Sequence, residues 1–249
     1  MGLPRVAGVT TFYTAGAIAP GDVVLDGAAA RHGRVLRLEH GDAVHLTDGR
    51  GTLGSGILAR IGKAEIVVTI ARVRSIEKLP PLDLFVPVAD RDRMLMLGEK
   101  AAELGVSGWH PVVFARSRSV ASRGAGDGFE NRLRSRMIAA LEQSGGAWLP
   151  DLHAPVPLTD ILDRDAPTRC VLDASGAPIL GASVHTAAAA VIGPEGGFEP
   201  DELRALTTAG WRAVRLAGNT LRFETAGIAA AAVLRAMLDH ASQRGQTHG

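Results

Sequence analysis

Residues 192–198 read Ile-Gly-Pro-Glu-Gly-Gly-Phe, and this stretch decides the fold of the chain. It follows the apolar run 187–192 and precedes Pro200, Asp201 and Glu202, a proline and two acids that are typical of the first turn of a helix. Three glycines, a proline and a carboxylate within five residues exceed what a plain turn requires. The pattern therefore predicts a strand that turns sharply into a helix, with backbone amides open to a ligand.

Two common nucleotide motifs do not explain this turn. The chain contains no Gly-x-x-x-x-Gly-Lys-Ser/Thr phosphate loop. Residues 49–54 match the spacing Gly-x-Gly-x-x-Gly, but residues 55–60 after them have the composition of a strand rather than a helix. We therefore interpret 49–54 as a hairpin turn between strands at 43–47 and 55–60.

A second motif stands about twenty residues after the turn. Residues 216–226 read Leu-Ala-Gly-Asn-Thr-Leu-Arg-Phe-Glu-Thr-Ala and lead into an alanine-rich final segment. Three further blocks precede it in the chain, at 34–42, 99–111 and 142–145. In this order the five blocks resemble the bacterial 16S rRNA (uracil-N3)-methyltransferase family, which belongs to the SPOUT class of RNA methyltransferases.

The resemblance covers nearly the whole chain and implies an architecture. Residues 1–78 would form an RNA-binding, PUA-like β-barrel, and residues 79–249 a SPOUT methyltransferase domain, an α/β domain with a parallel sheet and a trefoil knot. The knot is implied by the resemblance alone, because an unknotted chain is the default expectation. The family likeness further implies S-adenosyl-L-methionine as cofactor, 16S rRNA or the assembled small ribosomal subunit as substrate, and a homodimer as the active form.

The residue pattern supports the same division of the chain. Short β-type runs at 22–25, 43–47 and 65–70 are separated by glycines, and Pro80-Pro81 follows as a stiff joint. Beyond it, strand and helix patterns alternate with continuous apolar strands, which indicates a parallel α/β sheet. The expected strands are 82–88, 109–114, 170–173, 187–192 and 213–216, and the expected helices are 91–104, 131–143, 201–209 and 225–241.

Composition excludes several classes of protein. At 249 residues with 46% hydrophobic residues, the chain can form one large domain or two ordinary ones. Its single cysteine, Cys170, excludes an internal disulfide and a cysteine-rich zinc site, and its eight histidines show no metal-ligand spacing, so we expect no metal. No signal-peptide pattern and no apolar run of about 20 residues is present, so we expect a cytoplasmic protein without a membrane span.

The net charge is only +1, so any RNA binding must be local. Arginines concentrate in two places, and guanidinium groups suit phosphate oxygens. A single arginine of this kind is most often ordinary solvated surface, but as clusters they favour phosphate contact. The predicted RNA-binding residues are Arg31, Arg34 and Arg37 near the N-terminus and Arg116, Arg118, Arg132 and Arg136 in the second half.

The resemblance places the cofactor among three loops, which here are the loop after the strand at 170–173, the glycine-rich turn, and the motif 216–226. Backbone groups of glycine-rich loops could hold the adenine and ribose without charged side chains. The residues that match the family's cofactor site are Leu172, Asp173, Ile192, Gly193, Pro194, Glu195, Gly196, Gly197, Leu216, Gly218, Leu221, Arg222, Thr225 and Ala226.

Methylation of uracil N3 requires that its proton leave, after which negative charge spreads over O2 and O4. Arg222 could stabilise those oxygens, and Glu195 or Glu224, or a water held by either, could accept the proton. Glu224 has an equally good alternative role as a cap of the last helix. The sequence leaves the choice of base open.

Two departures from the family pattern bear on function. Asn219 stands where the family often has proline or arginine, and Phe223 where it usually has threonine. If they disrupted the pocket, the chain would be an RNA-binding protein without catalysis. A further alternative is a SPOUT enzyme that methylates a ribose 2'-oxygen or a guanine.

Overall fold

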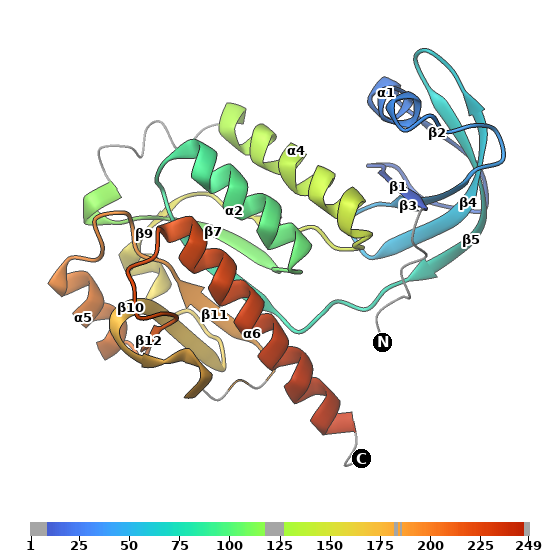
Figure 1. The fold of residues 1–249 in the computed structure, drawn as a ribbon. Helices are drawn as coiled ribbons and strands as arrows, with labels where there is room; N and C mark the ends of the chain where they lie inside the picture. The colour runs from blue at the N-terminus through green and yellow to red at the C-terminus, as the bar shows by residue number, and fades with distance from the viewer. Residues whose placement is uncertain (1–8, 118–126, 182–183, 185, 247–249) are drawn as a thin grey trace. The chain divides into compact units, whose positions relative to one another are not determined.

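The computed structural model of the chain describes residues 9–117, 127–181, 184 and 186–246 (Figure 1). The chain forms two compact units. The first comprises the residues up to 78 together with 138–149, and the second comprises 79–137 and the residues from 150 onward. Each unit has its own sheet.

The sheet of the first unit has the strand order β1-β3-β4-β5-β2. Its strands are β1 (Thr10–Tyr13), β2 (Gly21–Leu25), β3 (Ala43–Thr47), β4 (Thr52–Ile61) and β5 (Ile66–Ser75). All neighbours are antiparallel except β1 and β3. The β3–β4 pair confirms the predicted hairpin, but β4 begins at Thr52 rather than at the expected residue 55, so the turn comprises residues 48–51.

One helix of the first unit was not expected from the sequence. α1 (Gly27–Val35) begins after Asp26, whose Oδ1 accepts hydrogen bonds from the backbone nitrogens of Ala28 and Ala29 at 2.9 and 3.3 Å. Asp is a favourable N-cap residue, so this start has a local cause. The helix carries only two buried residues, Ala30 and Gly33, and therefore lacks the broad apolar stripe by which helices are recognised.

The end of α4 (Asp127–Ser144) and the residues after it belong with the first unit. Glu142 Oε1 accepts a hydrogen bond from the Tyr13 backbone nitrogen at 2.8 Å, and Trp148 Nε1 donates to the Ile76 carbonyl at 2.9 Å. Burial raises the pKa of the Glu142 carboxyl. The first contact joins residues that are 129 apart in sequence, and the second joins residues that are 72 apart.

The sheet of the second unit has the strand order β12-β10-β11-β6-β7-β8, and β9 also pairs with β7. Its strands are β6 (Leu82–Pro87), β7 (Gly108–Val113), β8 (Asp151–Leu152), β9 (Val156–Pro157), β10 (Thr168–Pro178), β11 (Ala188–Val191) and β12 (Arg212–Arg215). Every pair among them is parallel, and all four residues of β11 are buried. The parallel α/β sheet predicted from the continuous apolar strands is confirmed.

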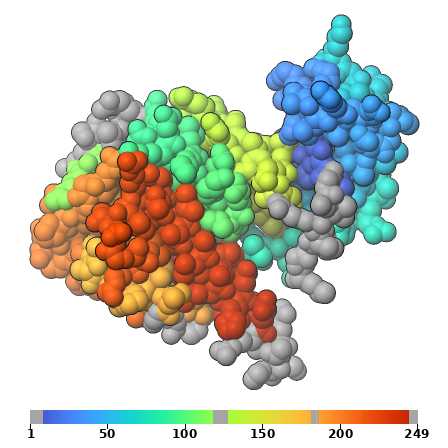
Figure 2. Space-filling view, viewed as in Figure 1, coloured from blue at the N-terminus to red at the C-terminus, as the bar shows by residue number. Residues whose placement is uncertain are grey.

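Helices cover both faces of this sheet. α6 (Phe223–Gln246) contacts α2 (Arg91–Glu103), β6 and β11, and the two helices lie side by side at the surface in Figure 2. A side chain at Gly227 would stand 2.8 Å from Leu97 and 2.9 Å from Ile192, so the glycine permits this close approach. On the opposite face, α5 (Pro200–Thr208) buries Leu206 against the sheet. The described residues also contain short 3₁₀ turns at Ala115–Ser117, Leu158–Ile161 and Ile179–Gly181.

Across the described residues, no helix combines the length and apolar character that crossing a membrane requires. The trefoil knot implied by the family resemblance stays a prediction.

Arg235 of α6 is a buried cation that holds three backbone carbonyls. It is 7% exposed, and it donates to the carbonyls of Pro80, Gly105 and Leu104 at 2.8, 2.5 and 3.3 Å. Gly105 has a φ of +66° and ends α2, as the sequence predicted. Arg235 therefore fixes the end of α2 and the start of the second unit together.

We predict that Arg235→Leu destabilises the protein by about 3 kcal/mol, because it leaves three carbonyls without their charged donor. Urea unfolding monitored by circular dichroism measures this change. Arg204→Leu is the matched control, since Arg204 is exposed and pairs only with Asp201, three residues earlier. Equal stability of the two variants would contradict the role assigned to Arg235.

Candidate active site

Three segments at the carboxyl ends of β10, β11 and β12 surround one cavity, which is where parallel α/β sheets bind ligands. The first is a bulge in β10. Leu172 and Ala177 both stand opposite Val214 of β12, so residues 173–176 between them leave the ladder. Gly176 lies so close to the backbone of Ala213 that a side chain there would stand 2.5 Å from it.

The second segment is the glycine-rich turn after β11. Within it, the Gly197 nitrogen donates to the Pro194 carbonyl at 2.8 Å. Arg116 binds the turn from outside, since it donates to the Gly196 carbonyl and forms an ion pair with Glu199 at 2.9 Å. Glu199 then caps α5, as expected.

Glu202 fixes the same helix start from its third position. Its Oε2 accepts from the Glu199 backbone nitrogen at 2.9 Å, and its Oε1 accepts from Ala115 at 2.7 Å. Pro200 is the first residue of α5, and Asp201 and Glu202 lie in its first turn, as predicted from the helix dipole. The strand, turn and helix therefore form one rigid corner.

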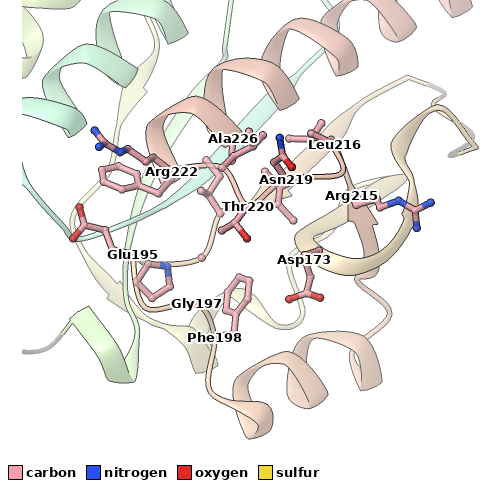
Figure 3. Close-up of a pocket in the computed structure, with 18 of the residues that line it drawn as sticks. Asp173, Glu195, Gly197, Phe198, Arg215, Leu216, Asn219, Thr220, Arg222 and Ala226 are labelled. Atoms are coloured by element: carbon pink, nitrogen blue, oxygen red, sulfur yellow. The ribbon is translucent and has the colours of Figure 1, made fainter.

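The third segment runs from the end of β12 to the first turn of α6, and Figure 3 shows its Leu216 and Asn219 close to Ala226, with Thr220 between them and Phe198 of the turn. The cavity between the three segments is open to solvent on one side and has a volume of about 490 Å³, within the range of small-molecule sites. Of the predicted cofactor residues, those that line it are Leu172, Asp173, Ile192, Gly193, Pro194, Glu195, Gly197, Leu216, Leu221, Arg222 and Ala226.

Three predicted cofactor residues, Gly196, Gly218 and Thr225, are absent from the cavity lining. Gly196 faces the other way, because a side chain there would meet Arg116 at 2.9 Å. Sequence reasoning missed nine lining residues, which are Arg93, Ala174, Phe198, Val214, Arg215, Ala217, Asn219, Thr220 and Phe223. Most of them are sequence neighbours of predicted residues. Arg93 is different, because it belongs to α2 and lies in none of the motifs from which the site was predicted.

The predicted catalytic residues occupy different environments. Arg222 lines the cavity and is exposed, and Glu195 lines it with a half-exposed side chain. Glu224 is 6% exposed, outside the lining, in the first turn of α6. Arg93 forms an ion pair with Glu195, and its Nε lies 4.0 Å from Glu224 Oε1.

The two departures from the family pattern leave the cavity open. Asn219 lines it, and Phe223 is a buried wall residue, 3% exposed, at the first position of α6. Neither side chain fills the space between the three segments. Asn219 and Phe223 therefore do not block the pocket, which was the condition under which the chain would be an RNA-binding protein without catalysis.

The predicted RNA-binding arginines divide into two groups. Three of those described already donate hydrogen bonds to the protein: Arg34 to the Gly62 and Lys63 carbonyls, Arg116 to the Gly196 carbonyl and the Glu199 carboxylate, and Arg132 to the Gly128 carbonyl. Arg136 forms an ion pair with Glu99 at 3.6 Å. Arg31 and Arg37 are exposed, and no side-chain partner exists for them within the residues described here. Arg118 lies outside the described residues.

Arg37 has a φ of +56°, which is the left-handed region that L residues other than Gly, Asn and Asp rarely adopt. It follows α1 at the position where glycine is preferred, and the next residue, Leu38, donates back to the Gly33 carbonyl at 2.9 Å. Strain of this kind at an exposed residue points to a functional reason for keeping the side chain.

Cys170 and His110 lie away from the cavity lining. The described residues contain no group of three or more His, Cys, Asp or Glu side chains that could hold a metal ion. Burial raises the pKa of the Cys170 thiol to about 11, so this cysteine is unreactive at neutral pH. His110 stacks on Phe85 and His153 and lies 3.4 Å from Asp83 at the amino ends of β6 and β7, opposite the cavity.

Comparison with known proteins adds to this geometry. A family model described as RNA methyltransferase domain matches residues 77–235, and one described as RNA methyltransferase PUA domain matches residues 25–71. The PUA-like character predicted for the first unit is thereby confirmed. The chain is 29% identical over 235 residues to the ribosomal RNA small subunit methyltransferase E of Mycobacterium bovis, covering 89% of this chain and 87% of the relative.

Solved structures agree. A methyltransferase of Legionella pneumophila, in complex with its cofactor SAM, has a TM-score of 0.80 and 28% identity over 92% of this chain and 97% of its own. The ribosomal RNA small subunit methyltransferase E of Neisseria gonorrhoeae, bound to S-adenosyl methionine, also has a TM-score of 0.80, with 26% identity over 92% and 98% of the two chains.

We predict that Arg37→Gly stabilises the protein by about 1 kcal/mol, because glycine adopts a positive φ without strain. The same change should weaken RNA binding and lower the slope of affinity against salt concentration by about 1, if the guanidinium contacts phosphate. Thermal unfolding and filter binding to 16S rRNA measure the two effects.

Arg37→Lys is the matched variant, since it keeps both the charge and the strain. It should retain most RNA affinity without any gain in stability. An Arg37→Gly protein that binds RNA as the wild type does would remove Arg37 from the RNA surface.

Proposed function

The chain belongs to the RNA methyltransferase family, and from this premise we propose that it transfers a methyl group from S-adenosyl-L-methionine to N3 of a uridine in 16S rRNA. The observation that carries the proposal is the cavity at the carboxyl ends of β10, β11 and β12, whose walls are the segments matching the family's cofactor loops. Two relatives of the same fold were solved with this cofactor.

The cavity fits such a cofactor. Its walls combine the apolar side chains of Leu172, Ile192 and Leu216 with the backbone of a turn that contains Gly193 and Gly197. Gly193 has no room for a side chain, because a Cβ would stand 2.9 Å from the ring of Phe198. Asp173 adds a carboxylate whose Oδ1 accepts from the Ser175 backbone nitrogen at 2.9 Å, which fixes its orientation.

The bound cofactor supplies a methyl group already activated on a sulfonium, so the protein has to position the uracil and handle one proton. Arg222 is exposed on the cavity wall, as a donor to the charge on O2 and O4 must be. Glu195 lies on the same cavity and is half exposed, which suits a group that takes a proton from the substrate and returns it to water.

The geometry favours Glu195 over Glu224 as the proton acceptor. Glu224 is buried and lies outside the lining, so a uracil in the cavity would not reach it. The role of Glu224 is instead structural or indirect, in the first turn of α6, where the helix dipole favours a carboxylate.

The wider setting of the reaction is also proposed. The substrate is 16S rRNA or the assembled small subunit, the active form is a homodimer, and the location is the cytoplasm. The names of the relatives support a ribosomal RNA substrate. Light scattering of the purified protein tests the homodimer, and methyl transfer to naked rRNA compared with small subunits tests the substrate form.

We predict that Gly193→Ala lowers the affinity for S-adenosylhomocysteine at least tenfold, because the added methyl displaces Phe198 from the cavity wall. Isothermal titration calorimetry measures this affinity. Gly128→Ala is the control, since a side chain at Gly128 meets no atom within 4 Å. Wild-type affinity in Gly193→Ala would argue against this cavity as the cofactor site.

We predict that Arg222→Gln lowers kcat for methyl transfer by about 10²-fold, because the charge that develops on uracil oxygens loses its cationic donor. Transfer of a labelled methyl group to 16S rRNA measures kcat, and calorimetry with S-adenosylhomocysteine should show affinity changed by less than about threefold. Equal loss in both measurements would make Arg222 a cofactor-binding residue.

The position of the methyl group decides between this proposal and methylation at other atoms. Mass spectrometry of nucleosides from the labelled rRNA should find 3-methyluridine. A 2'-O-methylated nucleoside or a methylated guanine in its place would refute N3 as the target. Deletion of the gene should remove the same nucleoside from cellular 16S rRNA, and the intact gene should restore it.

A further inference from the structure

Arg93 stands between two carboxylates that differ in their environment. It lies in the first turn of α2 and lines the cavity. One of its terminal nitrogens pairs with Glu195, whose side chain is 52% exposed, while its Nε lies 4.0 Å from Oε1 of Glu224, whose side chain is 8% exposed. A separation of 4.0 Å is too long for a hydrogen bond, so Arg93 is bonded to Glu195 and only near Glu224.

Glu224 keeps an unused acceptor in the interior. Its Oε2 is fully buried and has no hydrogen-bond partner within the described part of the chain. A buried carboxylate oxygen without a donor costs stability, so such groups call for a reason beyond packing. The nearest cation is Arg93, which is engaged elsewhere.

The pairing of Arg93 depends on the charge of Glu195. In the proposed reaction the N3–H bond of uracil breaks and its proton goes to Glu195, while N3 keeps the electron pair. That pair forms the bond to the methyl carbon as the carbon–sulfur pair returns to sulfur. Glu195 is then neutral, and Arg93 loses its ionic partner until the proton leaves for water.

We propose that Arg93 is a positioning residue that exchanges partners during this step. It pairs with Glu195 while Glu195 is ionised, and with Glu224 once Glu195 has taken the proton. The buried Oε2 of Glu224, which has no hydrogen-bond partner within the described residues, is the second position for the guanidinium. The inference rests on the proposed function, since the exchange follows from proton transfer to Glu195.

Within the described part of the chain, no other charged group near the turn contacts both carboxylates. Arg116 is held by the Gly196 carbonyl and Glu199, and the carboxylate of Asp90 accepts from the Arg93 backbone nitrogen at 3.1 Å as the cap of α2. Arg222 lines the same cavity and is exposed, but it forms no ion pair with Glu195 or Glu224 within the described residues. Among the described charged residues, Arg93 alone contacts Glu195 and approaches Glu224.

The exchange also explains why the second carboxylate is buried. A solvated Glu224 would attract Arg93 weakly, because water screens exposed ion pairs, whereas a desolvated one attracts it strongly once Glu195 is neutral. While Arg93 is paired with Glu224, it does not pull the Glu195 side chain away from the substrate. The exposure of Glu195 then lets the proton leave.

A crystal structure of the full-length Glu195→Gln variant tests the exchange without turnover, because glutamine mimics the neutral, protonated side chain. We expect a guanidinium nitrogen of Arg93 at about 3 Å from a Glu224 oxygen, shortened from 4.0 Å. Glu199→Gln is the matched control, because it removes a neighbouring carboxylate that pairs with Arg116 and should leave Arg93 on Glu195. Arg93 still bound to residue 195 in Glu195→Gln would overturn the proposal.

Kinetics provide a second test. Glu224→Gln should lower kcat about tenfold at unchanged KM for rRNA and unchanged affinity for S-adenosylhomocysteine, and Arg93→Lys should lose less than Arg93→Met. Wild-type kcat in Glu224→Gln would overturn the proposal. A wild-type protein without any methyl transfer would refute the proposed function, whereas the crystal structures report on the partner exchange in either case.

Discussion

The site depends on two arginines that bind the glycine-rich turn from outside and fix its shape. Residues 193–197 contain three glycines. Their conformational freedom lets the backbone form a wall of the cavity, but the glycines themselves contribute no side-chain contacts. Arg116 binds the turn at Gly196 and Glu199, and Arg93 binds it at Glu195. The direction of α5, the ring of Phe198 against Gly193 and the cavity between the three segments all follow from that fixed shape.

The sequence predicted what local chemistry determines. The apolar run before the turn forms β11, Pro200 begins α5 after Glu199, and Gly105 ends α2 with a positive φ. Each of these depends on a residue and its immediate neighbours, so pattern and spacing suffice. The walls of the cavity were predictable for the same reason, because parallel strands bring the loops after β10, β11 and β12 to one edge.

What the sequence could not predict depends on contacts between distant segments. Arg93 and Glu195 are 102 residues apart, and an arginine in the first turn of a helix has the pattern of ordinary surface. The sequence also does not show that Gly196 faces Arg116 rather than the cavity, because nothing distinguishes it from the other glycines of the motif. The return of residues 138–149 to the first unit is set by Glu142 and Trp148, which hydrogen-bond to partners far away in sequence.

The hydrogen bonds of each arginine distinguish structural arginines from those that remain available to a ligand. Arg34, Arg116 and Arg235 donate to backbone carbonyls, which fixes a turn or a helix end and uses the donors that a phosphate would need. Arg37 and Arg222 are exposed and make no such bonds within the described residues. With a net charge of +1, the molecule has no general attraction for nucleic acid, so we expect uncommitted guanidinium groups such as these to supply it locally. Counting arginines along the chain would therefore overestimate the RNA surface. An arginine already bonded to the protein has fewer donors left for phosphate, so the candidates are those without such bonds.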